Sequence, residues 1–446
     1  MNKATILFFA LLLISTSAFA QKTLKNVFIA NEGNFGAGNA TITAFDFDAK
    51  TSTDGVFFNA NGVALGDVAQ SLIEIDDQLF IVVNNSQKIV ITNPDTFQQT
   101  GQITLGAGAS PREIIPIGNG KTYITDLFGN HILVADLDSK SVLSDTIKVG
   151  RNPDQMLKVG NHVFVANNGF GADSTIFKID IATHTVVDTI EVSRGPAGMV
   201  LDREGTLWVV CTGYSGDYDD DFNLIPGTSR PGGVHGINPE SGEVMASIDV
   251  ASAGSDLAIN ESNDDLYINS GGIRVVNLKT LSTVADTLIK GNFYGFNYDP
   301  VNQLFFTADA KSFSSAGEIT YYSMDGTLIN SFASGIIPGD IHFSYEITSS
   351  IEDNHNTIVE NFELFQNYPN PFNPTTEISF SLPSASNARL TIFNTAGQKI
   401  AELINENLNA GNHSVTFNAS SISSGLYFYR LETNLGIITK KMMIVK

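Results

Sequence analysis

Phe80-Ile81-Val82-Val83-Asn84 is an apolar run that ends in a small polar residue, and variants of this run return along most of the chain. The copies lie at residues 27–31, 80–84, 123–126, 164–167, 208–211, 267–269 and 305–307. Seven copies with a mean spacing of about 46 residues match the length of a four-stranded propeller blade. The repeat therefore predicts an all-β body, a seven-bladed β-propeller.

Each repeat also contains the other strands that a blade needs. Alternating apolar and polar residues at 132–137, 176–180 and 186–190 predict further strands. A short strand follows a turn rich in Gly and Pro at 108–112, 150–154 and 193–197. Segment 337–343 lies beyond the seventh copy and is similar to the strands that follow these turns. We therefore expect it to form the innermost strand of the first blade and to close the ring.

Residues 1–20 have the features of a signal peptide. A basic start at Lys3 precedes an apolar run over 4–14, and Ala18-Phe19-Ala20 is a small-x-small cleavage site. The apolar run is short for a bilayer span, so cleavage is expected rather than anchoring. We expect an exported protein.

Charge and cysteine content narrow the choice of partners and chemistry. The formal net charge of -22 repels phosphate backbones and anionic lipid, which argues against nucleic-acid binding. The single cysteine, Cys211, lies in an apolar run, and we favour a buried core residue over a catalytic thiol. The fold must therefore be stable without an intramolecular disulfide.

The residue pattern of the sequence changes near the C-terminus. Pro369, Pro371 and Pro374 exclude a helix and a central strand, and alternating strands follow at 377–382, 389–393, 399–403, 413–417, 426–431 and 437–445. This pattern predicts a small immunoglobulin-like β-sandwich. The expected organisation is a signal peptide over 1–20, the propeller over 21–345, a linker over 346–362 and the sandwich over 363–446.

The body resembles the YVTN-type surface-layer propellers, and within them a set of exported propellers from Bacteroidetes-type bacteria. The resemblance rests on the strands that end in Asn, on the Gly-x-x-Pro turns and on the segments 31–36, 65–71 and 110–112. It implies the propeller fold. Some proteins of this kind capture corrinoids at the cell surface, so the partner candidates are a corrinoid-like small molecule, a glycan or a protein.

The C-terminal module resembles the type A sorting domain of type IX secretion. The matching residues of the sorting signal are Asn367, Tyr368, Pro369, Asn370, Pro371, Phe372, Asn373 and Pro374, then Gly425 and Tyr427, and finally Lys440, Lys441 and Lys446. The resemblance implies recognition by the type IX translocon and an extracellular or cell-surface location. It also implies attachment to surface lipopolysaccharide as one fate, and release as the other.

The candidate ligand site is one face of the propeller. In a blade, the loop between the second and third strands and the turn into the next blade emerge on the same face, so amide, guanidinium and aromatic groups from distant repeats would meet at one mouth. The expected lining is Asn31, Glu32, Asn34, Phe35, Asn84, Arg112, Asp126, Phe128, Arg151, Asn167, Phe170, Arg194, Tyr214 and Tyr294. The competing interpretation is that the Asn residues form turns and the Arg residues pair locally.

We assign no catalytic residues, and no cofactor is evident in the sequence. Asp217, Asp219 and Asp221 alternate in an acidic loop and are a weak calcium candidate, because hard cations prefer several oxygen ligands. The favoured function is a non-enzymatic binding protein. The alternatives are a secreted propeller enzyme, similar to polysaccharide lyases or hydrolases, and a surface adhesion protein.

Overall fold

The computed structural model describes residues 20–250, 254–260, 264–349, 362–367, 370–383, 385–395, 397–409, 411–420, 422–434 and 436–445. Almost all of the predicted signal peptide, residues 350–361 of the predicted linker, and Tyr368, Pro369 and Lys446 of the sorting signal lie outside these residues. The described chain forms two compact units, one over Lys22–Glu346 and one that begins at Ile347. Each is considered by itself.

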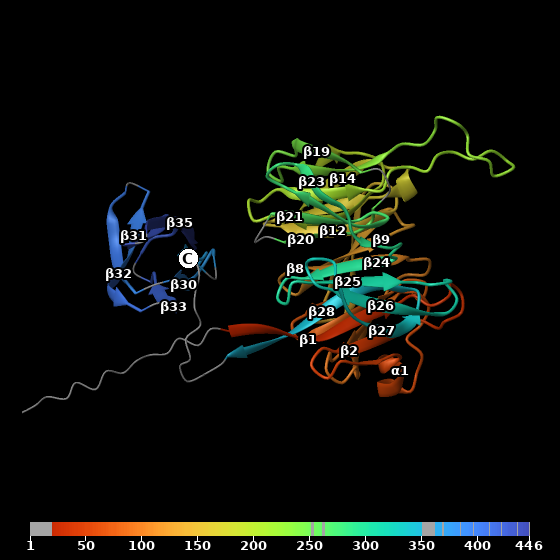
Figure 1. Ribbon diagram of the computed structural model, residues 1–446, viewed down its shortest axis with the longest axis horizontal. Coiled ribbons are helices and arrows are strands. Elements are labelled where there is room, and N and C mark those ends of the chain that lie inside the picture. The colour runs from red at the N-terminus through yellow and green to blue at the C-terminus, as the bar shows by residue number, and fades with distance from the viewer. Residues whose placement is uncertain are drawn as a thin grey trace, which may run out of the picture. The chain divides into compact units, whose positions relative to one another are not determined.

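The first unit contains seven four-stranded sheets within its described residues, and the first of them joins the two ends of the unit (Figure 1). Its strands are, in order, β28 (Pro338–Ser349), β1 (Ala20–Asn31), β2 (Thr41–Asp46) and β3 (Thr51–Thr53).

The other six sheets each use four strands that are consecutive in the chain. Their strands are β4 (Ala69–Ile75), β5 (Gln78–Val83), β6 (Lys88–Thr92) and β7 (Gln99–Thr104); β8 (Pro111–Gly118), β9 (Lys121–Asp126), β10 (His131–Asp136) and β11 (Ser141–Lys148); β12 (Pro153–Val159), β13 (His162–Asn167), β14 (Thr175–Asp180) and β15 (Thr185–Glu191); β16 (Pro196–Leu201), β17 (Leu207–Cys211), β18 (Gly232–Ile237) and β19 (Val244–Val250); β20 (Leu257–Asn260), β21 (Asp265–Asn269), β22 (Gly272–Asn277) and β23 (Ser282–Lys290); β24 (Gly295–Asp299), β25 (Leu304–Asp309), β26 (Ala316–Tyr322) and β27 (Leu328–Ile336).

Among the described residues of this unit, two short helices interrupt the pattern. Helix α1 (Val56–Asn61) follows the first sheet, and the 3-10 turn η1 (Gly169–Gly171) lies between β13 and β14. Both sit in connections, so the unit is all-β and propeller-like, which confirms the all-β prediction.

Apolar cores lie between neighbouring sheets rather than on one face of each sheet. Strand β5 is buried at five successive positions, because its odd residues pack on the preceding sheet and its even residues on the following one. The same division explains the apolar repeats of the sequence. Leu79 and Ile81 belong to the cluster shared with the first sheet, whereas Phe80 and Val82 belong to the cluster shared with the third.

The circle of sheets closes through β28. The last sheet and the first share a core that contains Phe306, Ile29 and Ile341. On one side of β28, Asn297 donates its amide to the carbonyl of Ile341 at 2.7 Å. On the other side, the backbone N–H of Leu72 in β4 donates to Asp340 at 2.7 Å. These contacts confirm the predicted closing strand.

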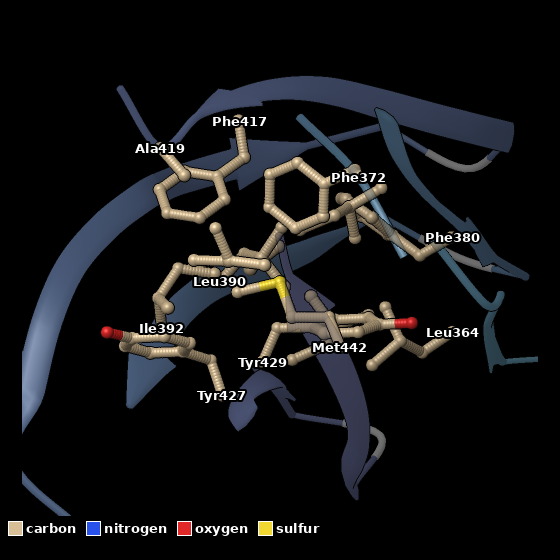
Figure 2. Packing of buried hydrophobic residues seen from close by; sticks show 14 of the residues in the cluster. Leu364, Phe372, Phe380, Leu390, Ile392, Phe417, Ala419, Tyr427, Tyr429 and Met442 are labelled. Atoms are coloured by element: carbon tan, nitrogen blue, oxygen red, sulfur yellow. The ribbon is translucent and has the colours of Figure 1, made fainter. Parts of the chain in front are cut away.

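The second unit consists of two sheets that share one core. One sheet contains β29 (Glu363–Leu364), β30 (Thr375–Leu382) and β33 (Gly411–Asn418), and the other contains β32 (Lys399–Leu408), β31 (Ser386–Asn394), β34 (Gly425–Thr433) and β35 (Gly436–Ile444). Figure 2 shows side chains of both sheets, among them Phe417, Leu390 and Met442, meeting in this core.

Replacing Ile341 by Ala tests the closure. Ile341 is 2% exposed, so the substitution should lower the free energy of unfolding by about 2–4 kcal/mol. Ile329 in the neighbouring β27 is 48% exposed, so Ile329→Ala is the matched control and should cost less than about 1 kcal/mol. Urea denaturation of the full chain measures both. Equal effects of the two substitutions would contradict the closing role of β28.

Candidate functional site

A cavity of about 520 Å³ lies where the innermost strands of all seven sheets meet. Each innermost strand, β28, β4, β8, β12, β16, β20 and β24, contributes residues at or beside its N-terminal end. A cavity with this lining is central to the circle of sheets. It therefore brings together side chains that are up to about 300 residues apart in the chain.

β-Bulges turn the polar residues of the inner strands toward this cavity. The register of the inner strand shifts at the same place in four sheets, between Ala69 and Ser71, Pro111 and Ile114, Pro153 and Met156, and Pro196 and Met199. A bulge bends its strand and re-aims the side chains within it. Gln70, Arg112, Glu113, Asp154 and Ala197, all cavity residues, lie within these shifts.

Five carboxyl groups and one guanidinium line the cavity: Glu32, Glu113, Asp154, Asp256, Asp340 and Arg112. Arg112 pairs with Asp154, with 3.2 Å between Nε and Oδ1. Glu32 accepts hydrogen bonds from the Tyr294 hydroxyl at 2.9 Å and from Gln70 at 3.3 Å. The lining therefore has more acidic groups than its one cation can neutralise.

Burial raises the pKa of four of these carboxyl groups, those of Glu32, Glu113, Asp256 and Asp340. Desolvation raises the pKa of Glu113 to about 8, and the nearby charges of Asp154 and Asp340 add to the rise. Desolvation likewise raises the pKa of Asp256 to about 6, against hydrogen bonds from Asn269 and Ser255 that lower it. The pKa values of Glu32 and Asp340 are raised by the same cause. Glu113 and Asp256 can therefore exchange protons near neutral pH.

The predicted ligand residues fall into several environments. Glu32, Arg112 and Tyr294 line the central cavity. Arg151, Arg194 and Tyr214 line a second cavity, of about 460 Å³. Residues that the sequence assigned to one mouth therefore line two separate cavities.

Four of the predicted residues are buried and hold turns in place. Asn31, Asp126 and Asn167 each end a strand, Asn84 directly follows one, and all four are at most 9% exposed. Asn84 donates to the carbonyl of Pro111 at 2.7 Å, and Asp126 accepts from the backbone N–H of Gly129 at 3.0 Å. These polar groups are occupied within the fold, so we leave them out of the ligand surface proposed below.

The remaining predicted residues lie in loops between the second and third strands of their sheets. Phe35, Phe128 and Phe170 are strongly exposed. Asn34 donates its amide to the carbonyl of Phe313 at 2.9 Å, which joins the loops of the first and last sheets. Exposed aromatic rings of this kind suit the binding of flat apolar surfaces.

Sequence reasoning missed the carboxyl groups Glu113, Asp256 and Asp340. Each lies within an inner strand or immediately before one. The sequence at these positions does not distinguish a residue that lines the cavity from an ordinary strand residue. The one signal was the acidic residue that follows Ser110-Pro111-Arg112.

The acidic loop is held by its own hydrogen bonds. Asp217 accepts from the Tyr214 hydroxyl at 2.6 Å, and Asp219 accepts from the backbone N–H groups of Asp221 and Asn223 at 3.0 and 2.8 Å. The described residues contain no group of three or more His, Cys, Asp or Glu that could hold a metal ion. Calcium binding by Asp217, Asp219 and Asp221 stays a prediction.

In the second unit, the Pro-rich motif and the terminal strand of the sorting signal lie together. Phe372 and Ile444 form a parallel bridge, and Asn370 accepts from the backbone N–H of Met443 at 2.8 Å. Asn367 is buried, and its backbone N–H donates to the Tyr429 hydroxyl at 2.9 Å. That hydroxyl in turn donates to the carbonyl of Phe365 at 2.8 Å. The two motifs therefore form one folded element.

The other described residues of the sorting signal follow the same arrangement. Pro371, Asn373 and Pro374 belong to the entry segment, and Ala419 donates to the carbonyl of Pro374 at 2.8 Å. Gly425 opens β34, opposite Ile444. Tyr427 is buried in the core, whereas Lys441 is exposed on β35 and Lys440 is partly exposed beside it.

Comparison with known protein families identifies the C-terminal unit. Residues 366–445 match the family described as a secretion system C-terminal sorting domain. The chain is thus an all-β, propeller-like protein that type IX secretion exports to the cell surface or the extracellular medium, and its sorting domain interacts with that machinery. No helix among the described residues is both long and apolar enough to cross a membrane.

The family of the body follows from a second match. Residues 25–329 match the family described as a domain of unknown function, DUF5074. The match spans more than half of the chain, so the protein belongs to the DUF5074 family. No curated protein matches the chain.

Solved structures agree on the fold. A quinonprotein alcohol dehydrogenase-like protein from Bacteroides thetaiotaomicron is 14% identical with a TM-score of 0.54, over 72% of this chain and 79% of that one. A functionally unknown protein from Desulfotomaculum acetoxidans is 10% identical with a TM-score of 0.53, over 72% and 98%. The hydrazine synthase of Kuenenia stuttgartiensis is 16% identical with a TM-score of 0.51, over 63% and 95%. At these identities the likeness concerns the fold alone.

Glu113→Gln should reduce the pH dependence of folding stability. The folded protein holds the Glu113 proton up to about pH 8, whereas the unfolded chain releases it near the ordinary pKa of 4.5. The folded state therefore binds more protons between these values, and stability falls as pH rises through that window. The free energy of unfolding of the variant should therefore fall by roughly 1–3 kcal/mol less than that of the wild type over this pH range.

Urea denaturation at about pH 6 and about pH 8.5 measures this difference. The exposed Glu243 provides the control, because Glu243→Gln removes the same charge and should leave the difference unchanged. A Glu113→Gln variant whose stability still falls as steeply as the wild type would show that Glu113 ionises normally.

Proposed function

We propose that the protein is a cell-surface binding protein whose central cavity holds a small ligand rich in cationic or hydrogen-bond-donor groups. The observation that carries the proposal is the lining itself, in which five carboxyl groups face one cavity and a single arginine opposes them. In that setting a bound amine or guanidinium would replace protons as the compensating charge. The rest of the lining, including Phe293 and Tyr294, would contact the apolar part of the ligand.

We also propose that the body is a seven-bladed propeller of the YVTN type. Seven sheets, a core between each pair of neighbours and the closing strand β28 support it. We further propose cleavage of a signal peptide after Ala20 and an immunoglobulin-like topology for the sorting domain. Two sheets around one core support the latter. Attachment to surface lipopolysaccharide also belongs to the proposal.

The charge of the cavity narrows the ligand candidates. The sequence allowed a corrinoid, a glycan or a protein segment as the ligand. The carboxyl lining favours those candidates that present amines or many hydrogen-bond donors. Because ligand binding would draw on the ionised form of Glu113, affinity for an amine should rise as pH increases toward 8.

A secreted enzyme is the second candidate, and the raised pKa of Glu113 is the observation in its favour. A carboxyl group that keeps its proton near neutral pH can act as a general acid beside an ionised partner. Turnover of a polysaccharide that disappears in Glu113→Gln while binding persists would identify this function.

A thermal-shift screen of the full chain tests the binding function, with spermidine, glucosamine, cobalamin and a neutral oligosaccharide as probes. We expect an amine-bearing probe to stabilise the protein. Asp256→Asn should weaken that binding about tenfold, since it removes a charge-assisted contact.

The exposed Glu243 again supplies the matched control, and Glu243→Gln should bind as the wild type does. A neutral probe that binds best, or an Asp256→Asn variant with undiminished affinity for the amine, would refute the proposed ligand class. A cobalamin hit would instead assign the cavity to a corrinoid.

A further inference from the structure

Three arginines from separate loops line the second cavity, which lies apart from the carboxyl-lined one. Arg151 precedes β12, Arg194 precedes β16, and Arg230 precedes β18. Tyr214 forms part of the same lining, and Asp217 is the one carboxyl group in it. We call this the arginine cavity. Its volume of about 460 Å³ suits a small ligand or one or two units of a polymer.

Close packing of two loops fixes the wall of the arginine cavity. The connection between β17 and β18 protrudes as a long light-green ribbon (Figure 1). At its base, Tyr214 and Arg230 pair antiparallel through two backbone hydrogen bonds of 2.9 Å, which puts their side chains on one face. Gly171 of η1 approaches so closely that a Cβ on it would lie 2.5 Å from the carbonyl oxygen of Gly213. The wall is therefore built into the fold.

The arginines of this cavity differ from the other arginines of the chain, all of which lie in described residues. The others form ion pairs, and these are Arg112, Arg203, Arg274, Arg389 and Arg430. No carboxylate in the described chain lies within ion-pair distance of Arg151, Arg194 or Arg230. The three guanidinium groups are exposed and form no ion pair among the described residues, so they are available to an acidic ligand.

Neighbouring carboxylates are held by other donors. Asp217 receives the Tyr214 hydroxyl, and Asp173 accepts from the backbone N–H groups of Arg151, Ser174 and Thr175 at 2.7 to 3.0 Å. These carboxylates accept hydrogen bonds from donors within the loops, so the guanidinium groups remain available to a ligand.

Backbone carbonyls orient two of the guanidinium groups. Arg230 donates from Nη1 to the carbonyls of Gly227 and Ser229 at 2.9 and 2.8 Å, and Arg194 donates from Nη1 to the carbonyl of Ala172. Within the described residues, the Nε and Nη2 groups of both arginines and the whole guanidinium of Arg151 make no hydrogen bond. A guanidinium held at one nitrogen presents its remaining N–H donors in a fixed fork, the geometry that binds carboxylate or sulfate.

An exposed aromatic pair includes a residue that is close in the chain to the cavity lining. Phe170 lies in η1, two residues before the cavity residue Ala172, and its ring is 6.4 Å from that of Phe128. The two side chains are 66% and 65% exposed. Phe170 also has a positive φ of 51°, which costs an aromatic residue backbone energy. An exposed ring of this kind can stack against the flat face of a ligand.

We propose that the arginine cavity and the Phe128–Phe170 pair bind an acidic saccharide, a glycan whose sugar units carry carboxylate or sulfate groups. The guanidinium groups take the acidic substituents, and the aromatic pair takes the face of an adjoining sugar ring. This site goes beyond the function proposed for the central cavity, because its charge has the opposite sign and its lining shares no residue with that cavity.

Isothermal titration of the full chain with sulfated, uronic-acid and neutral hexasaccharides tests the proposal. We expect an acidic hexasaccharide to bind and the neutral one to fail. Arg151→Gln should weaken binding about tenfold without loss of stability, since that side chain has no partner to lose in the described fold. Arg203→Gln is the matched control, because it removes one positive charge elsewhere on the same unit, and it should bind as the wild type does.

Two further measurements separate the parts of the site. Phe170→Ala should weaken binding of the acidic hexasaccharide and leave the weaker affinity for inorganic sulfate unchanged, whereas Arg230→Gln should weaken both. The proposal is overturned if no acidic hexasaccharide binds, if the neutral one binds equally well, or if Arg203→Gln costs as much affinity as Arg151→Gln. A preference for a nucleoside diphosphate over every saccharide would overturn it as well.

Discussion

The pairing of β28 with β1 is the constraint on which the rest of the first unit depends. This pairing places the end of a unit of more than 300 residues against its beginning. Each described sheet of the unit therefore packs between two others. The side chain of Asp340 receives the Leu72 N–H, and Asn297 bonds the adjoining carbonyl. A circle fixed in this way fixes the positions of all the inner strands, and through them the width and lining of the central cavity.

Both candidate sites arise from deviations within an otherwise regular repeat. Bulges in the inner strands turn Arg112 and Glu113 toward the centre, where burial raises the pKa of the glutamate. A long insertion between β17 and β18 brings Arg230 beside Tyr214 and so completes the arginine cavity. The regular parts of each sheet supply stability, and the irregular parts supply the chemistry.

The sequence predicted the repeat, the all-β class and the closing strand, because apolar periodicity and turn residues act locally. It predicted the site less well. The Asn residues at the strand ends resemble exposed ligand groups in sequence, yet they are buried and bonded within the fold. Asn84 donates to the carbonyl of Pro111 in the next sheet, and Asn167 donates to the Thr175 hydroxyl. Glu113 was missed because a bulge breaks the two-residue alternation that normally assigns a side chain to a face. Arg230 was missed because its neighbour Tyr214 is close only after the insertion folds.

Native-state hydrogen exchange of the full chain tests the closure most directly. The account predicts that backbone amides of β28 between residues 339 and 343 are protected as strongly as those of β1, and that both exchange through one global opening. If the β28 amides exchanged at least about a hundredfold faster than those of β1, the strand would open independently. The circle would then be held without it, and the central cavity would lose the geometry on which its proposed function depends.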